Sequence, residues 1–190
     1  MKFTPTSIEN AFVIEWESSS DDRGSFARIF CAREFQDQGL HPKIVQANLC
    51  TTKEKGTLRG MHYQIPPAEE SKLVRCVRGS IFDVIVDMRA DSPTFLKHFG
   101  ILLSAENRRA LYVPPLCAHG YQTLTDDAHV LYQTGEFYNP ECERGLRYND
   151  PALKLEWPLP ISSISEKDAN WPLLGKPIEY EHSHSTSDLA

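Results

Sequence analysis

Two β-strands joined by a tight turn are indicated by the sequence LVRCVRGSIFDVIVD at residues 73–87. Leu73–Val77 and Ile81–Asp87 are rich in β-branched residues, which are favoured in strands. Between them, Arg78-Gly79-Ser80 contains a glycine suited to a sharp reversal of the backbone. Because short apolar runs and turn residues keep alternating on both sides, this stretch sets the fold class that we expect.

Further short strands are predicted before and after this stretch, separated by residues typical of turns. They are Lys43–Leu49, Phe99–Leu103, Ala110–Val113 and Ala128–Gln133, and Asp21–Phe26 is predicted as a turn that leads into a strand. The main helix that the sequence indicates is short, beginning near Cys31 and ending at Gly39. Short strands without a long amphipathic helix predict an all-β sandwich or barrel.

The length and composition of the chain predict one soluble domain. The 190 residues suffice for a single buried core, and 41% hydrophobic with 24% charged residues is an ordinary balance. No apolar run approaches the length of a membrane span, so no membrane association is expected. We expect one domain at residues 1–175 and a polar, mobile tail at residues 176–190.

Charge and cysteine content disfavour several other classes of protein. The net charge of −6 argues against nucleic-acid binding, which depends on neutralising phosphates. The first residues lack the pattern of a secretory signal. An odd number of scattered cysteines argues against a disulfide framework or structural zinc site and predicts a reducing cytoplasm. These cysteines are Cys31, Cys50, Cys76, Cys117 and Cys142.

Candidate chemistry is concentrated in GTLRGMHYQ at residues 56–64 and in the following SKLVR at residues 71–75. His62 can take up a proton near neutral pH, and the cations Arg59 and Lys72 can stabilise an anion. A lone histidine is more often structural than catalytic, and arginines are often solvated surface charges. Arg23 and Arg59, however, each adjoin a glycine at a predicted turn, which suits bidentate binding of phosphate or carboxylate. His62 and His119 are expected at strand ends.

A metal-binding barrel would also explain several histidines in a β protein. Such a site normally uses a close His-x-His pair, an acidic ligand and a later histidine. Here His62 is followed by Tyr63-Gln64, and the sole His-x-His is His182-Ser183-His184 in the predicted polar tail. The sequence therefore predicts no metal site.

A series of motifs in the same order along the chain resembles the dTDP-4-dehydrorhamnose 3,5-epimerase family. The motifs lie between Asp21 and Asp168, so they cover most of the chain. They are Asp21-x-Arg23-Gly24, LRGMHYQ at 58–64, KLVR at 72–75, Val84-x-Val86-Asp87, SPTF at 92–95, LSAEN at 103–107, Val113-Pro114, Ala118-His119-Gly120, Trp157-Pro158 and SEKD at 165–168.

The resemblance implies a fold, a reaction and a mode of assembly. The fold would be a double-stranded β-helix, or jelly-roll barrel, of the cupin type, and the protein would be a homodimer. It would act without a metal or other cofactor on a nucleotide-linked 4-keto-6-deoxyhexose and would invert C3 and C5. For the family's own substrate, dTDP-4-dehydro-6-deoxy-D-glucose would become dTDP-4-dehydro-L-rhamnose.

The resemblance also implies roles for individual residues. By position, His62 matches the family's catalytic base, Asp168 its paired carboxylate, Tyr132 the acid on the opposite face of the sugar, and Lys72 the cation near the C4 oxygen. The remaining matches are to substrate-binding positions, with Tyr138 as the aromatic that stacks on the base. These positions are Arg23, Gln46, Asn48, Arg59, His119, Tyr138, Glu143 and Lys167.

Two departures from the family pattern leave different functions open. Arg28 stands where the family usually has glutamate, and Ala47 stands where it usually has aspartate, both at the nucleotide end of the substrate. The substrate could therefore be a CDP- or GDP-linked sugar or a dideoxysugar. Inversion of C3 or C5 alone is also open, because it depends on how the sugar ring turns between proton transfers. A metal-dependent cupin enzyme and a non-catalytic sugar-nucleotide binding barrel stay open as well.

Overall fold

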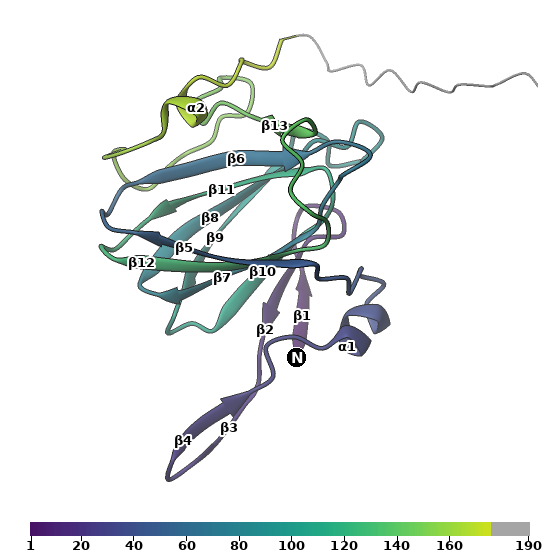
Figure 1. Cartoon of the computed structure of the whole chain (residues 1–190), viewed down its shortest axis with the longest axis vertical. Helices are drawn as coiled ribbons and strands as arrows, with labels where there is room; N and C mark the ends of the chain where they lie inside the picture. The colour runs from purple at the N-terminus through teal and green to yellow at the C-terminus, as the bar shows by residue number, and fades with distance from the viewer. Residues whose placement is uncertain (176–190) are drawn as a thin grey trace, which may run out of the picture.

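The computed structural model describes residues 1–175, which contain thirteen strands and two short helices (Figure 1). The predicted tail at residues 176–190 lies outside this part. The strands are β1 (Lys2–Pro5), β2 (Phe12–Glu15), β3 (Ser18–Asp21), β4 (Gly24–Ala27), β5 (Gln46–Thr52), β6 (Leu58–Gln64), β7 (Lys72–Arg78), β8 (Ser80–Asp87), β9 (His98–Ser104), β10 (Arg109–Val113), β11 (Cys117–Thr123), β12 (Ala128–Thr134) and β13 (Glu143–Gly145). The helices are α1 (Ala32–Asp37) and α2 (Glu166–Ala169).

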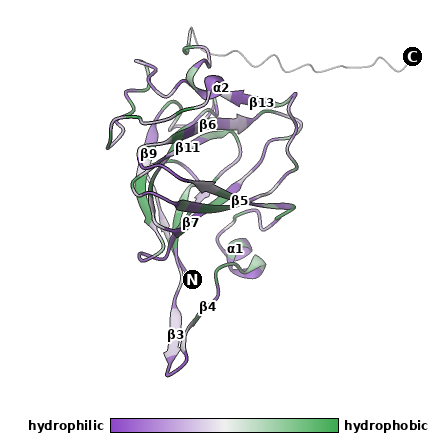
Figure 2. Cartoon of the chain, turned by 60° about the vertical axis from the view of Figure 1, so that its left-hand side comes forward, coloured by the Kyte–Doolittle hydropathy of each residue, from purple (hydrophilic) through white to green (hydrophobic). Residues whose placement is uncertain are grey.

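Two antiparallel sheets form the body of the protein. One sheet has six strands in the order β1-β2-β10-β7-β12-β5, and the other has five in the order β13-β6-β11-β8-β9. The hairpin β3-β4 forms a separate two-stranded sheet that extends away from the body (Figures 1 and 2). This architecture confirms the predicted jelly-roll barrel. No helix of residues 1–175 is long and apolar enough to cross a membrane.

The strands predicted from residues 73–87 are both present as β7 and β8, but they do not form a hairpin. The turn at Gly79, whose φ is 71°, carries the chain from the six-stranded sheet to the five-stranded sheet. A Cβ on Gly79 would lie 2.3 Å from Thr125 Oγ1, so the turn also needs a residue without a side chain. The tight turn therefore connects the two layers of the barrel.

The long apolar run of β8 reflects burial on both of its faces. Ile81 and Ile85 point between the sheets and pack with Val74 in the main core. Val84 and Val86 point to the opposite face and pack against a second apolar cluster, which contains Leu146 and Leu153 and is joined by Trp157 and Leu174. The segment after residue 145 thus covers the outside of the five-stranded sheet.

The predicted helix near Cys31 is confirmed as α1, and it covers part of the six-stranded sheet. Phe35 is 1% exposed, and its ring packs against Phe3 and Tyr112 with centroid separations of 5.3 and 5.9 Å. These aromatic contacts bury the helix where β1, β2 and β10 would otherwise expose an apolar face.

The predicted strand Lys43–Leu49 is displaced in the structure. Strand β5 begins at Gln46 and continues to Thr52, because it pairs with β12 from Gln46↔Thr134 to Thr52↔Ala128. The pairing with a distant strand, rather than local composition, sets its ends. Strands β1, β2 and β11 were not predicted from the sequence.

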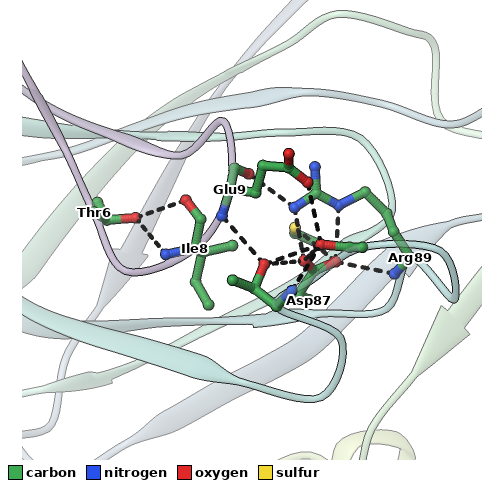
Figure 3. A network of polar contacts seen from close by, with 8 residues as sticks. Thr6, Ile8, Glu9, Asp87 and Arg89 are labelled. Carbon is green, nitrogen blue, oxygen red and sulfur yellow. Dashed lines mark hydrogen bonds and ion pairs between the residues drawn. The ribbon is translucent and has the colours of Figure 1, made fainter.

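A buried carboxylate network fastens the turn between β1 and β2 to the end of β8 (Figure 3). Asp87 is fully buried and accepts hydrogen bonds from Arg89 Nε at 2.8 Å, Ser92 Oγ at 2.6 Å and Thr94 Oγ1 at 2.6 Å. Arg89 Nη2 in turn donates to the carbonyl oxygen of Glu9 at 2.8 Å. Burial alone would raise the pKa of Asp87, but these donors hold the pKa below its usual value.

Replacing Asp87 by alanine is expected to lower the free energy of unfolding by about 3 kcal/mol or more, because Arg89 and two hydroxyls lose a buried acceptor. In the wild type, the lowered folded-state pKa means that this contribution is present above about pH 4 and is lost as pH falls through the folded value. Urea unfolding at several pH values measures both effects. Glu15→Ala, which breaks solvent-exposed ion pairs, is the matched control and should cost much less. An equally small cost for Asp87→Ala would contradict the prediction.

Candidate active site

A cavity of about 440 Å³ lies between the two sheets, and its lining includes residues of β13 and α2. Ten of the twelve residues predicted for the site line it, and Lys167 and Arg23 do not. The ten are Gln46, Asn48, Arg59, His62, Lys72, His119, Tyr132, Tyr138, Glu143 and Asp168.

Alternation along the strands brings these side chains together. Gln46 and Asn48 lie two residues apart on β5 and face the cavity, while Tyr132 and Thr134 do so on the neighbouring β12. The predicted strand-end position of His62 and His119 is wrong, since both lie inside strands. They lie side by side on the cavity face of the sheet, because His119 of β11 pairs with His62 of β6.

His62 and Asp168 form a close pair across 106 residues of sequence. His62 Nε2 lies 2.6 Å from Asp168 Oδ1, and Asp168 Oδ2 accepts a hydrogen bond from the Gly60 N–H at 3.1 Å. Burial would raise the pKa of this carboxyl, but His62 and the Gly60 N–H hold the pKa below its usual value. An ionised carboxylate only accepts, so His62 Nε2 carries the hydrogen and Nδ1 is left basic.

The local structure around Asp168 explains its fixed position. It lies in α2, where Ser165 caps the helix by accepting the Asp168 N–H at 3.1 Å. Strands β6 and β11 also approach closely: a Cβ on Gly60 would lie 2.6 Å from both Gly120 Cα and the His119 carbonyl oxygen. This approach brings the Gly60 N–H within reach of the carboxylate.

The indole ring of Trp171 packs against the ring of His62. Its ring meets the His62 ring edge-on, with centroids 6.1 Å apart at an interplanar angle of 68°. The space for the indole exists because Gly145, which pairs with His62 across β13 and β6, has no side chain. A Cβ there would lie 2.0 Å from Trp171 Cε2.

A second histidine–carboxylate pair is formed by His119, which lines the cavity, and Asp83, which lies behind it and does not. His119 Nε2 is 2.7 Å from Asp83 Oδ1, and Asp83 is fully buried. Burial raises the pKa of the Asp83 carboxyl, although the neighbouring His119 opposes this rise. Asp83 was not predicted as a site residue; its signal was a carboxylate placed between Ile81 and Ile85 on the inward face of β8.

Lys72 and Tyr132 face the cavity from adjacent strands of the six-stranded sheet, β7 and β12. Lys72 Nζ donates a short hydrogen bond to Glu70, and both side chains are only 9% exposed. Burial raises the pKa of the Tyr132 phenol, as do Cys50 and Glu70, while Arg59 opposes them. Glu70 is a further pocket residue that the sequence did not single out.

The rim of the cavity carries the aromatic and polar groups expected for the nucleotide. Tyr138 is exposed, and its hydroxyl donates to Glu143 Oε2 at 2.8 Å. Lys167 Nζ donates to the same oxygen at 2.6 Å and lies 5.7 Å from the Trp171 ring centroid. Lys167 therefore contacts the rim although it does not line the cavity. Gln46 accepts the Tyr138 N–H at 3.4 Å.

The two arginines singled out from the sequence differ in location. Arg59 lines the cavity and uses Nε to donate to Thr52 Oγ1 at 3.1 Å, which leaves the rest of its guanidinium for a ligand. Arg23 lies in the turn of the β3-β4 hairpin, with its side chain 90% exposed and bonded to Asp21. One chain alone does not bring Arg23 to the cavity, so its substrate contact stays a prediction.

The cavity thus combines a histidine–aspartate base, a phenol and a buried cation in one barrel. No group of three or more His, Cys, Asp or Glu side chains in residues 1–175 is arranged to hold a metal ion, and the His-x-His pair at residues 182–184 lies outside that part. The fold and the cavity together define a barrel enzyme of the acid–base class.

Comparisons with known proteins identify the family. The model of the dTDP-4-dehydrorhamnose 3,5-epimerase family matches residues 5–176. The chain is 42% identical over 171 residues to the dTDP-4-dehydrorhamnose 3,5-epimerase of Shigella flexneri, covering 90% of this chain and 94% of the relative. The chain belongs to the dTDP-4-dehydrorhamnose 3,5-epimerase family, and its members are isomerases.

Solved structures agree with this assignment. The crystal structure of dTDP-4-dehydrorhamnose 3,5-epimerase from Elizabethkingia anophelis is similar with a TM-score of 0.88 and 38% identity, covering 91% of this chain and 96% of that one. The dTDP-6-deoxy-D-glucose-3,5-epimerase of Legionella pneumophila, in complex with dTDP-4-keto-L-rhamnose, is similar with a TM-score of 0.84 and 37% identity, covering 90% and 92%.

Proposed function

We propose that this protein converts dTDP-4-dehydro-6-deoxy-D-glucose to dTDP-4-dehydro-L-rhamnose by inverting C3 and C5. The relatives' activities and the dTDP-linked sugar in the Legionella pneumophila structure support this substrate. The observation that carries the proposal is the His62–Asp168 pair, 2.6 Å apart, in one cavity with Lys72 and Tyr132.

In the first step, His62 Nδ1 removes the proton from a carbon next to the C4 ketone. The electron pair of the broken C–H bond moves into an enolate whose oxygen is negatively charged. The ammonium of Lys72 stabilises that oxygen, with Arg59 as a second cation. Asp168 stabilises the imidazolium that forms.

In the second step, Tyr132 returns a proton to the same carbon from the opposite face, because one histidine cannot serve both faces. The raised pKa of Tyr132 keeps the phenol protonated and able to donate at neutral pH. His62 then loses its proton to solvent and Tyr132 regains one from solvent, and repeating the two steps at the other carbon completes the reaction. Each step moves only a proton, so the proposed mechanism uses no metal or cofactor.

The remaining predicted residues would bind the substrate. His119, held by Asp83, would bind a sugar or phosphate oxygen, and Tyr138 would stack on the base at the rim. The other proposed contacts come from polar groups around the same opening. They are Gln46, Asn48, Glu143 and Lys167.

We also propose that the protein works as a homodimer. Phe26 on the projecting hairpin is 76% exposed, and Leu49 and Val77 on the six-stranded sheet are 58% and 44% exposed. A second copy would cover these apolar side chains and give Arg23 a site to contact. The five free thiols in residues 1–175 support the cytoplasm as the location.

Incubating the protein with dTDP-4-dehydro-6-deoxy-D-glucose in deuterated water tests the function. NMR should show deuterium at both C3 and C5 without added metal. Incorporation at one carbon alone would identify a single-site epimerase, and exchange only with a CDP- or GDP-linked sugar would overturn the proposed nucleotide. Chelator should leave the rate unchanged, and loss of activity in chelator would contradict the metal-free mechanism.

Replacing Tyr132 by phenylalanine separates the two steps. The variant keeps the ring but loses the donor, so His62 should still exchange protons while inversion falls by about 100-fold. Comparing deuterium incorporation with the formation of inverted product measures this. Tyr148→Phe, a tyrosine outside the cavity lining, is the control. Unchanged inversion in Tyr132→Phe would remove Tyr132 from the mechanism.

A further inference from the structure

A buried carboxylate lies beside the groups proposed for catalysis. Glu70 lines the cavity, accepts a hydrogen bond from Lys72 Nζ and has a side chain that is 9% exposed. A negative charge next to the cation that holds an enolate weakens the attraction between them. Glu70 would therefore slow the reaction unless its carboxylate also assisted the reaction in another way.

We propose that Glu70 is a positioning residue for the epimerisation, which directs the Lys72 ammonium toward the C4 oxygen and maintains the proton-donating form of Tyr132. This inference rests on the proposed function. It adds to that function a residue that touches no reacting atom and acts through two groups that do.

The first part of this role follows from the flexibility of lysine. An ammonium on a four-carbon chain can turn freely, whereas transition-state stabilisation depends on preorganised donors. Lys72 is the first residue of β7 and pairs there with Thr134. Its hydrogen bond to Glu70 uses one of three N–H donors and so fixes the directions of the other two.

The loop that carries Glu70 is itself fixed on both sides. Gln64 Nε2 donates to the Ala68 carbonyl oxygen at 2.7 Å before Glu70, and the Gly135 N–H donates to the Ser71 carbonyl oxygen at 2.9 Å after it. A Cβ on Gly135 would lie 2.5 Å from Ser71 Oγ, so β12 and the loop are in close contact. The backbone that carries Glu70 is therefore held in place on both sides, close to Lys72.

The second part of this role follows from the charges around Tyr132. Burial, Cys50 and Glu70 raise the pKa of the phenol, and Arg59 lowers it. The titratable and charged groups that line the cavity with Tyr132 come from five strands, α2 and two loops. They are Cys50, Arg59, His62, Tyr63, Glu70, Lys72, His119, Tyr121, Tyr138, Glu143 and Asp168. Among those that act on Tyr132, Glu70 is the carboxylate, and its charge opposes formation of the phenolate.

Two variants separate orientation from charge. Glu70→Gln keeps an oxygen that accepts from Lys72 but removes the negative charge, whereas Glu70→Ala removes both. We expect kcat of Glu70→Ala to fall about tenfold or more, with KM changed less than about threefold. Glu70→Gln should keep kcat within about threefold at neutral pH, but the alkaline limb of its kcat profile should move to lower pH, because Tyr132 ionises more easily.

The measurement is kcat and KM across the pH range for wild type, both variants and Glu69→Gln, an exposed neighbour outside the cavity lining. A wild-type kcat for Glu70→Ala would overturn the orienting role, and an unmoved alkaline limb for Glu70→Gln would overturn the effect on Tyr132. If Glu70→Ala does not fold, the pH profile of Glu70→Gln still tests the effect of Glu70 on Tyr132. A wild-type protein that epimerises no nucleotide-linked 4-keto sugar would instead refute the proposed function.

Discussion

Replacing His62 by asparagine is expected to lower the rate of C3 and C5 proton exchange by about 1,000-fold or more. The amide cannot accept the proton at neutral pH, and general-base catalysis contributes about 100- to 10,000-fold. Asparagine can still accept or donate hydrogen bonds at Asp168, so the cavity should keep its shape. Deuterium incorporation into the sugar at both carbons measures the loss directly.

A matched control for this variant is His129→Asn. His129 also pairs with an aspartate, Asp127, at 3.3 Å, but it does not line the cavity. Its replacement should leave exchange unchanged. Substrate affinity of His62→Asn, measured by calorimetry, should stay within about tenfold of wild type, since the loss concerns the transition state. Exchange at a near wild-type rate in His62→Asn would show that another group is the base.

The second large effect is expected for Asp168→Asn. The amide is neutral, so the imidazolium formed during proton removal loses its counter-charge, and the tautomer of His62 is no longer fixed. We expect kcat to fall by about 100-fold with a small change in KM. Steady-state kinetics with the dTDP-linked ketone measures this.

Asp91→Asn, at an exposed position away from the cavity, is the control for removing one carboxylate. An unfolding transition close to wild type would show that Asp168→Asn keeps the fold. If kcat of such a folded variant were unchanged, Asp168 would serve only to cap and anchor the segment after residue 160.

The strands of the barrel were largely predictable, because their signals are local. Ile81–Asp87 and Ala110–Val113 carry β-branched or apolar runs bounded by turn residues, and they appear as β8 and β10. Strand β11 contains Ala118, His119 and Gly120, which have no such local preference. It is a strand because β6 and β8 flank it on both sides, and this tertiary pairing is invisible to composition.

The site was predictable only in part, because only some of its residues lie close together in the sequence. Spacing alone drew attention to His62, Arg59 and Lys72, which lie within 14 residues of one another. Asp168 came only from family resemblance, since the contact with His62 depends on how the last segment folds over the five-stranded sheet. Asp83 was hidden in a strand whose apolar neighbours explained it as part of the core.

The close approach of β6 and β11 has a consequence for how this enzyme can evolve. A Cβ on Gly60 meets Gly120 Cα and the His119 carbonyl oxygen, and a Cβ on Gly120 meets the Arg59 carbonyl oxygen at 2.7 Å. Since these obstacles are backbone atoms, no change of a neighbouring side chain relieves them. Neither glycine can therefore be replaced by another residue in a single mutation without moving the backbone of the catalytic strand pair. Tyr138 at the rim is exposed, so substitutions there can change the nucleotide that is bound without disturbing the fold.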